Sequence, residues 1–159
     1  MSKTARSPRT AKPAVPHRGW RRHHVAAATL ALLGTGGNAA PVNWVGDDGG
    51  FWDITGNWDA GQPGASADVQ LLAFNTTLRS GSYGVRSLVG SGRLTLSGGS
   101  LSFTEASTLG SMLLSGGSLG GSGTLLVSGA SEWQRGVLSG AGAATFSGGL
   151  AITGTDVHD

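Results

Sequence analysis

The segment Leu94–Leu101 reads LTLSGGSL, and the same pattern returns at Met112–Leu119 as MLLSGGSL. A repeat this short cannot bury a hydrophobic face by itself, so each copy must stack on its neighbours. Glycine interrupts every window after residue 40, and each interior glycine costs a helix about 1 kcal/mol, which disfavours stacked helices. Within the repeat, apolar and polar residues alternate with a period of two, which indicates strands. The repeat therefore predicts short strands stacked one above the next.

We expect an all-β protein that folds as a right-handed parallel β-helix, that is, a β-solenoid. Each turn, here called a rung, would place Leu, Val and Phe inward and Ser and Thr outward, with glycine at corners that need positive φ. Degenerate copies follow at Leu125–Gly129, Gly136–Gly140 and Thr145–Gly149. Their Ser-Gly pairs are unevenly spaced, which requires irregular rungs or half-rungs; the pairs from the second full copy onward begin at Ser115, Ser128, Ser139 and Ser147. The alternatives are a Gly/Ser-rich β-sandwich and a loosely ordered segment whose repeats reflect composition.

Residues 1–40 have the order of a secretory signal peptide. A basic stretch that ends at Arg21-Arg22 precedes an apolar or small-residue run, Val25–Leu33, and the pair Ala39-Ala40 follows. This order of basic region, apolar region and small-residue cleavage site predicts export, with cleavage after Ala39 or Ala40. The apolar run is too short to span a membrane, which takes about 20 residues. The alternatives are a twin-arginine signal and an ordinary N-terminal helix.

Positive charge is concentrated at the start of the chain. Seven of the 11 Lys and Arg residues precede residue 23, and no Asp or Glu occurs before Asp47. From Pro41 onward there are 4 Arg and 9 acidic residues, a formal charge of −5. A basic patch is the electrostatic mark of a nucleic-acid-binding protein. Once the signal peptide is removed no such patch is left, so we expect no nucleic-acid partner.

Residues 41–80 differ in composition from the Gly/Ser-rich chain that follows, and we interpret them as an N-terminal cap. The end of a solenoid exposes both its hydrophobic core and its unpaired strand edges, and large aromatic rings are suited to cover them. Residues 81–159 would be the solenoid rungs, and because they stop in mid-pattern we expect the array to be truncated. The residues assigned to the cap are Trp44, Trp52, Asn57, Trp58, Pro63 and Asp68.

The order Trp44, Trp52, Asn57-Trp58, Pro63 and Asp68-Val69, followed by LTLSGGSL, resembles the N-terminal region of large bacterial surface and secreted β-solenoid proteins. These include autotransporter passengers, haemagglutinin-like adhesins and exported proteins with a C-terminal sorting tail. The resemblance covers most of residues 44–153. It implies an extracellular or cell-surface location and a role in adhesion, matrix formation or display, and it implies no single chemistry. The chain departs from the family in its length, because nothing in it resembles a membrane barrel or a sorting tail.

The residue types raise two ligand sites, one for calcium and one for sugar rings. Calcium prefers carboxylate oxygens, but the spacing of the aspartates matches neither a calcium loop nor a nonapeptide array, and turn formation explains most of them. These aspartates are Asp47, Asp48, Asp53, Asp59 and Asp68. Sugar rings stack on aromatic faces, and Trp133 with Arg135 is the candidate outside the cap, against the alternative that Trp133 packs in the core. We therefore expect no cofactor, with Ca²⁺ as the alternative, and a weak ligand site at Trp133 and Arg135.

The sequence does not predict an enzyme. A glycosidase needs two carboxylates about 5–10 Å apart, whereas Glu105, Glu132 and Asp156 belong to different rung regions. The only histidine after residue 40 is His158, which leaves a serine triad without a base, and cysteine is absent from the chain.

We expect a non-catalytic structural or adhesive protein of the bacterial surface. The alternative is a secreted carbohydrate-binding or matrix-associated module, and a third interpretation is a self-assembling β-fibril. Partners would be extracellular polysaccharide, a host or neighbouring cell surface, or a second copy at the open solenoid end.

Overall fold

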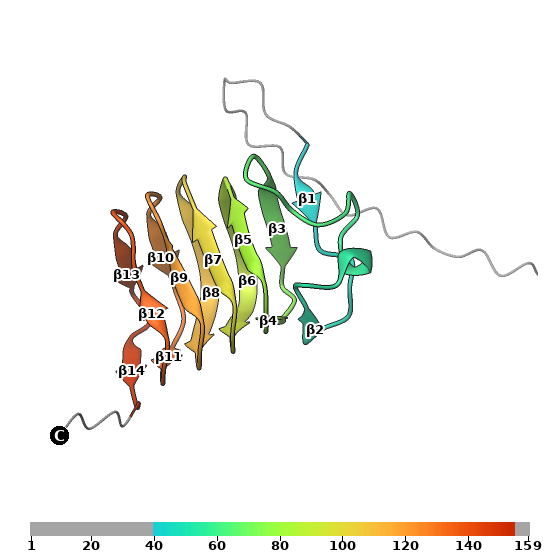
Figure 1. The fold of residues 1–159 in the computed structure, drawn as a ribbon. Coiled ribbons are helices and arrows are strands. Elements are labelled where there is room, and N and C mark those ends of the chain that lie inside the picture. The colour runs from blue at the N-terminus through green and yellow to red at the C-terminus, as the bar shows by residue number, and fades with distance from the viewer. Residues whose placement is uncertain (1–39, 155–159) are drawn as a thin grey trace, which may run out of the picture. The chain divides into compact units, whose positions relative to one another are not determined.

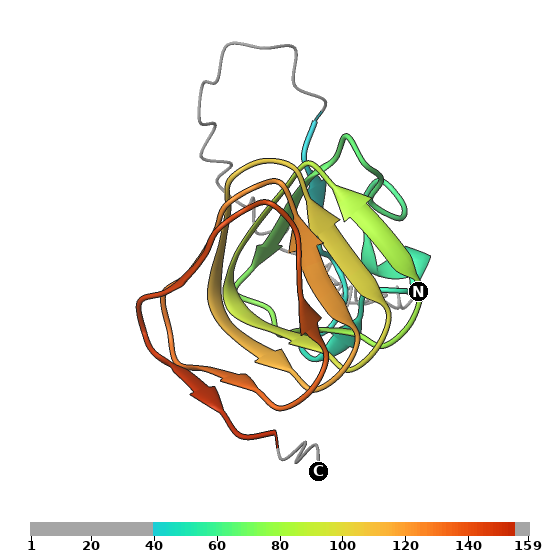
Figure 2. The ribbon, with the colours of Figure 1, turned by 60° about the vertical axis from the view of Figure 1, so that its left-hand side comes forward.

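The computed structural model describes residues 40–154. The predicted signal peptide therefore lies outside the described residues, except for Ala40. The described chain is all-β and forms a solenoid of about five turns, as the sequence predicts. Figure 1 shows the strands lying side by side in chain order, and Figure 2 shows the turns nested as a three-sided coil. All pairings between the named strands are parallel, so the β-sandwich alternative is wrong.

Each rung contributes strands to up to three faces. The first face stacks β1 (Val42–Asn43), β3 (Asp68–Leu72), the first halves of β6 (Ser87–Leu96) and β8 (Ser107–Leu114), β10 (Leu125–Val127) and β13 (Ala144–Phe146). The second face stacks β2 (Gly50–Phe51), β4 (Thr76–Leu78), the second halves of β6 and β8, β11 (Ser131–Trp133) and β14 (Leu150–Ile152). The third face stacks β5 (Ser82–Val85), β7 (Ser100–Phe103), β9 (Ser118–Gly121) and β12 (Val137–Leu138). A short 3-10 helix, η1 (Thr55–Asn57), follows β2 in the chain and precedes β3.

The interval between the two copies of the motif is the rung spacing. Leu94 pairs with Met112, and Leu101 pairs with Leu119, so the two copies lie directly above one another. The stacked leucines are almost fully buried, because period-two alternation turns every second side chain inward. Burial of one such side chain contributes about 1.5–3 kcal/mol, so the apolar columns supply most of the stabilisation.

The later motif copies belong to two different corners of the same regular coil. Leu125 pairs with Ser107 and with Ala144, whereas Val137 pairs with Ser118. The Ser-Gly pairs at Ser128 and Ser139 therefore follow different faces, and the rung length stays near that of the first repeat. The expectation of half-rungs is wrong, because the unevenly spaced Ser-Gly pairs lie at three different corners of the coil. The pair at Ser115 follows the second face, the pair at Ser139 follows the third, and the pairs at Ser128 and Ser147 follow the first.

A column of glycines marks the corner between the second and third faces. Gly81, Gly99, Gly117 and Gly136 occupy successive rungs with φ of 86°, 71°, 71° and 98°. A Cβ on Gly99 would lie 2.6 Å from the carbonyl oxygen of Gly81, and a Cβ on Gly136 would lie 2.6 Å from that of Gly117. Both the left-handed backbone and the close stacking therefore require glycine here.

Three hydroxyl side chains point into the core, so the expectation that Ser and Thr face outward is wrong for Thr76, Ser107 and Ser131. Ser107 Oγ accepts a hydrogen bond from the backbone N–H of Leu88 at 3.0 Å and donates to the carbonyl of Glu105 at 3.3 Å. Ser131 makes the same pair of bonds with Met112 and Gly129. The serines are tolerated inside because each hydroxyl bonds to backbone groups of the ladder.

Candidate functional site

Three tryptophans form one buried aromatic cluster at the N-terminal end of the described solenoid. Trp44, Trp52 and Trp58 are between 0% and 4% exposed. Trp58 packs edge-on against both others, with ring centroids 4.9 Å from Trp44 and 4.7 Å from Trp52. Edge-to-face pairs of this kind contribute about 0.5–1.5 kcal/mol beyond their buried area.

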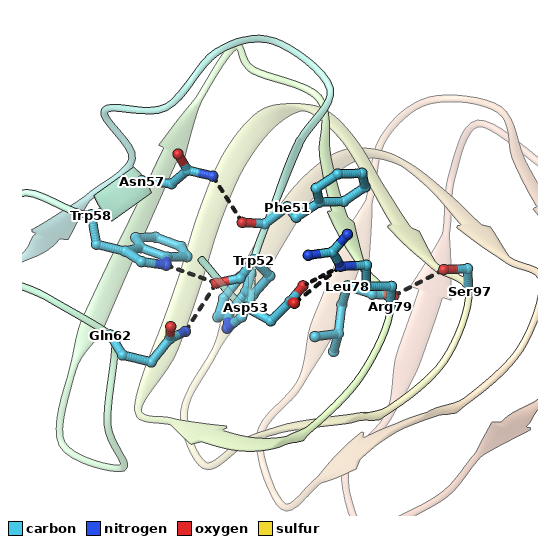
Figure 3. Close-up of polar contacts among 9 residues, drawn as sticks. All are labelled: Phe51, Trp52, Asp53, Asn57, Trp58, Gln62, Leu78, Arg79 and Ser97. Carbon is cyan, nitrogen blue, oxygen red and sulfur yellow. Dashed lines mark hydrogen bonds and ion pairs between the residues drawn. The ribbon is translucent and has the colours of Figure 1, made fainter. Parts of the chain in front are cut away.

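The strand register explains why the rings lie over the core. The backbone N–H of Trp44 donates to the carbonyl of Gln70, which places Trp44 beside the buried Leu71. The N–H of Trp52 donates to Thr77 in the same way, which places Trp52 beside Leu78 (Figure 3). Each ring therefore covers the first residue of an apolar column, the place where the core would otherwise meet water.

Side-chain hydrogen bonds hold the aromatic cluster together. The carbonyl of Trp52 accepts from Trp58 Nε1 at 2.9 Å and from Gln62 Nε2 at 3.0 Å, as Figure 3 shows. Asn57 Nδ2 donates to the carbonyl of Phe51 at 2.9 Å. Pro63, next to Gln62, is buried. All the residues assigned to the cap from sequence except Asp68 thus lie in or beside one cluster before the first complete rung.

Four of the five aspartates considered for calcium bind protein groups instead. Asp53 pairs with Arg79, whose Nε lies 3.0 Å from the carboxylate, and the Arg79 guanidinium also lies 3.9 Å from the ring centroid of Phe51. Asp68 accepts from both Arg86 and Ser87. Within residues 40–154, no group of three or more His, Cys, Asp or Glu side chains is arranged to hold a metal ion.

The other two bonded aspartates connect segments far apart in sequence. Asp48 accepts from the backbone N–H and the side-chain amide of Asn75, at 2.7 and 3.2 Å. Asp59 accepts from the backbone and side chain of Asn43, at 2.8 and 2.6 Å. Desolvation of the largely exposed carboxylate raises the pKa of Asp59, but the bonds from Asn43 and from neighbouring backbone N–H groups outweigh it and lower the pKa. The backbone carbonyl of Asp47 accepts from Gly50 and closes the turn before β2.

Trp133 and Arg135 have different environments. Trp133 is half-buried and packs against the hydrophobic core, and its Nε1 donates to the carbonyl of Gly136 at 3.3 Å. In the ladder Trp133 pairs with Leu114 below and Ile152 above, so it continues an inward column. Arg135 is exposed at the next corner. The structure therefore does not bring the two side chains together on one exposed face.

A polar groove of about 330 Å³ lies beside Arg135. Next to it, Glu132 Oε1 accepts from Gln134 Nε2 at 3.0 Å and from Thr153 Oγ1 at 2.8 Å. These two bonds, from Gln134 first and Thr153 second, lower the pKa of Glu132; the charge of Arg93 lowers it further, and desolvation acts weakly in the opposite direction. The groove is lined by Ser115, Gln134, Arg135, Thr153 and Gly154. Its donors and acceptors suit hydroxyl-rich ligands.

Sequence reasoning missed several residues that connect the cap to the rungs. Gln62 bonds to Trp52, and Asn75 bonds to Asp48 while its Oδ1 accepts from the backbone N–H of Arg93 at 2.9 Å. Asn75 precedes Arg93 by 18 residues, the length of one rung, and this spacing is the sequence signal that could have identified Asn75. Nothing local marks Gln62, whose role depends on the folded loop.

Comparisons of the chain with models of protein families, with curated proteins and with solved structures find no match. The fold and its surfaces are therefore the basis for inferring function. Over the described part of the chain, no helix has the length and apolar character needed to cross a membrane.

Proposed function

We propose that this chain is a rigid, non-catalytic structural element of an exported protein, working as a rod at the bacterial cell surface in adhesion or display. The observation that carries the proposal is a single apolar core that runs through the rungs and is covered at the N-terminal end by Trp44, Trp52 and Trp58. Such a cap gives a rod a defined starting point, because it shields from water the apolar core that the first rung would otherwise expose.

The stacked backbone explains the rigidity. Parallel hydrogen bonds join each rung to the next on all three faces, and serine side chains add bonds at the corners, as when Ser115 Oγ donates to the carbonyl of Leu96 at 3.2 Å. Bending such a rod would open hydrogen bonds on one side and compress the apolar columns on the other. Recognition would then take place on the outward positions of the strands.

Export and surface display are tested by expressing the full chain, with the segment 1–40 intact, in a bacterium. We expect the protein to lose its N-terminal segment after Ala39 or Ala40, measured by mass spectrometry, and to be digested by protease added to intact cells. Leu30→Arg, which interrupts the apolar run, is the matched control and should keep the chain inside and unprocessed. An unprocessed, protease-protected wild-type chain would contradict the proposal.

A second candidate function is carbohydrate binding in the polar groove beside Arg135. Its volume of about 330 Å³ falls in the range of small-molecule sites, about 300–1,000 Å³. Planar guanidinium and amide groups there suit sugar hydroxyls and carboxylates. Retention of the full chain in gels that contain acidic or neutral polysaccharides tests it. Arg135→Ala should weaken retention, and retention equal to that of wild type would reject the groove.

A further inference from the structure

We infer that this chain associates head to tail with a second copy of itself, the Trp-capped end of one copy docking on the last described rung of the next. The inference deepens the proposed rod function by naming the partner at the rod's end, and it rests on that function. It starts from two features at opposite ends of the described solenoid, a hollow in the apolar core and a set of protruding apolar side chains.

The hollow lies at the C-terminal end of the core. On the third face the inward column runs Val85, Phe103, Gly121 and then Gly140 at the next corner, so two successive rungs contribute no side chain there. The result is a cavity of about 140 Å³, bordered by Phe103, Leu119, Leu125 and Leu138 and extending to Ala143 and Ala144. Both alanines are exposed, so the last rung forms its rim.

A hollow of this size takes one large apolar side chain. An apolar cavity of about 150 Å³ stays dry when empty and binds a benzene-sized group. The surrounding atoms lose dispersion contacts while the hollow is empty, and an inserted side chain restores them. Within residues 40–154, no strand pairs with the outer edges of β12, β13 and β14.

The opposite end carries the protruding groups. Val45 and Ile54 are 58% and 43% exposed, although they flank a cluster of fully buried tryptophans. Figure 1 places β1, β2 and η1 at one end of the strand stack and β12, β13 and β14 at the other. Of the eight large apolar side chains exposed in the described residues, five belong to the first or the last rung. They are Val45, Phe51, Ile54, Val137 and Ile152.

Charge favours the same pairing of ends. The cap end presents the exposed carboxylates of Asp47 and Asp48, and the last complete rung presents the exposed guanidinium of Arg135. Contact between two unlike surfaces of the same molecule is heterologous, and unless the rotation closes a ring it extends into a filament. A pair of cap ends would instead bring carboxylates against carboxylates, and a pair of C-terminal ends would bring Arg135 against Arg135.

Sedimentation velocity of the full chain over a concentration series tests the inference. Val45→Asn/Ile54→Asn removes the protruding groups, and Asn at position 54 is a preferred residue before η1. Ala144→Asp places a carboxylate on the rim of the hollow. We expect wild type to form oligomers of increasing length, each variant alone to associate at least tenfold more weakly, and an equimolar mixture to stop at a 1:1 dimer. Leu126→Asp, exposed on the first face, is the control and should associate like wild type.

Each alternative gives a different result. Association through the sides of the rod would leave both variants self-associating and weaken only Leu126→Asp, and like-end dimers would persist in one of the two variants. Either result, or a wild-type chain that stays monomeric, overturns the inference. A monomeric chain that is nevertheless exported and displayed would leave the proposed rod function standing.

A covalent probe gives a second reading that does not depend on polar substitutions. The chain contains no cysteine, so Ile54→Cys and Ala144→Cys each introduce a single thiol. Disulfides form only when Cα atoms come within about 7 Å. Under mild oxidation the mixture should give the 54–144 heterodimer, identified by peptide mapping, in at least tenfold excess over a mixture of Leu126→Cys with Ala144→Cys. Equal yields from the two mixtures would overturn the inference.

Discussion

The indole N–H of Trp58 donates a hydrogen bond to the backbone carbonyl of Trp52 at 2.9 Å, while the two rings pack edge-on with centroids 4.7 Å apart. The only polar side-chain atom of Trp58 is thus hydrogen-bonded, and its ring fills the gap between the rings of Trp44 and Trp52. Because Trp52 also packs near Tyr83, at 6.3 Å, the cap is continuous with the core of the first complete rung. Cap and rungs should therefore unfold together.

We predict that Trp58→Ala lowers the free energy of unfolding by about 3–5 kcal/mol, the usual cost of removing a large buried aromatic side chain. Trp58→Phe keeps an apolar ring and loses the bond to Trp52, so its cost should be smaller, about 1–3 kcal/mol. Denaturant unfolding followed by far-UV circular dichroism measures both. Val137→Ala, at an exposed site, is the control and should stay within about 0.5 kcal/mol of wild type. Equal stability of Trp58→Ala and this control would show that the cluster does not stabilise the fold.

Three glycine-to-alanine substitutions separate backbone strain from close stacking. Gly99 has φ of 71° and a Gly81 oxygen 2.6 Å from the added Cβ, Gly149 has φ of 92° in open space, and Gly64 has open space only. Gly149→Ala should cost about 1–2 kcal/mol from the left-handed backbone alone. Gly99→Ala should cost more, and Gly64→Ala should be neutral or stabilise by up to about 1 kcal/mol. Thermal midpoints in any other order would contradict the stacking argument.

Ser107→Ala should lower stability by about 1–3 kcal/mol, because the buried N–H of Leu88 would lose its acceptor. Ser131→Ala should have a similar effect through Met112. Ser102→Ala, on the exposed side of β7, is the matched control. Hydrogen exchange at the Leu88 amide provides the specific reading, since it should accelerate in Ser107→Ala and remain slow in Ser102→Ala.

Asp59 makes a small part of the stability depend on pH. Its pKa in the folded chain lies below its ordinary value of 3.8, so its contribution is complete above that value and is lost as the pH falls through the lowered pKa. Asn43→Ala removes the side-chain donor and should raise the pKa of Asp59, as followed by NMR of the carboxyl carbon. Because the carboxylate is exposed, solvent screens the effect on stability. An unchanged titration in Asn43→Ala would assign the lowered pKa to the backbone donors.

The fold could be predicted because its determinants are local and repeated. The alternation of Leu94 and Leu96 with polar residues, and the return of the motif at Met112–Leu119, indicate both the strand and the rung. The inward serines could not be predicted, because Ser107 differs from an outward serine only in its phase relative to the neighbouring strands. A one-residue change of phase exchanges the two faces, and the phase is set by corners that sequence does not reveal.

The site was less predictable than the fold for the same reason. The cap tryptophans were recognisable by their number within a short segment, but the pairs Asp48–Asn75 and Asp53–Arg79 depend on rungs that are adjacent only after folding. The sequence left Trp133 open between a ligand contact and core packing. In the structure Trp133 lies two residues after the buried Ser131 on the same strand, so its side chain turns inward, and this orientation is set by the fold.

Trp133 turns inward, whereas Arg135 is exposed, so replacing them should have opposite effects on stability and on retention by polysaccharide. Trp133→Ala should lower the free energy of unfolding by about 1–3 kcal/mol, less than a fully buried tryptophan, because its ring is half-exposed. Arg135→Ala should leave stability within about 0.5 kcal/mol of wild type, because the side chain is exposed, while weakening retention by polysaccharide. Retention must be compared at a temperature where both variants stay folded, so that unfolding is not mistaken for a loss of binding. If Trp133→Ala instead kept full stability and lost retention, the indole would contact the ligand and the inward column would end at Leu114.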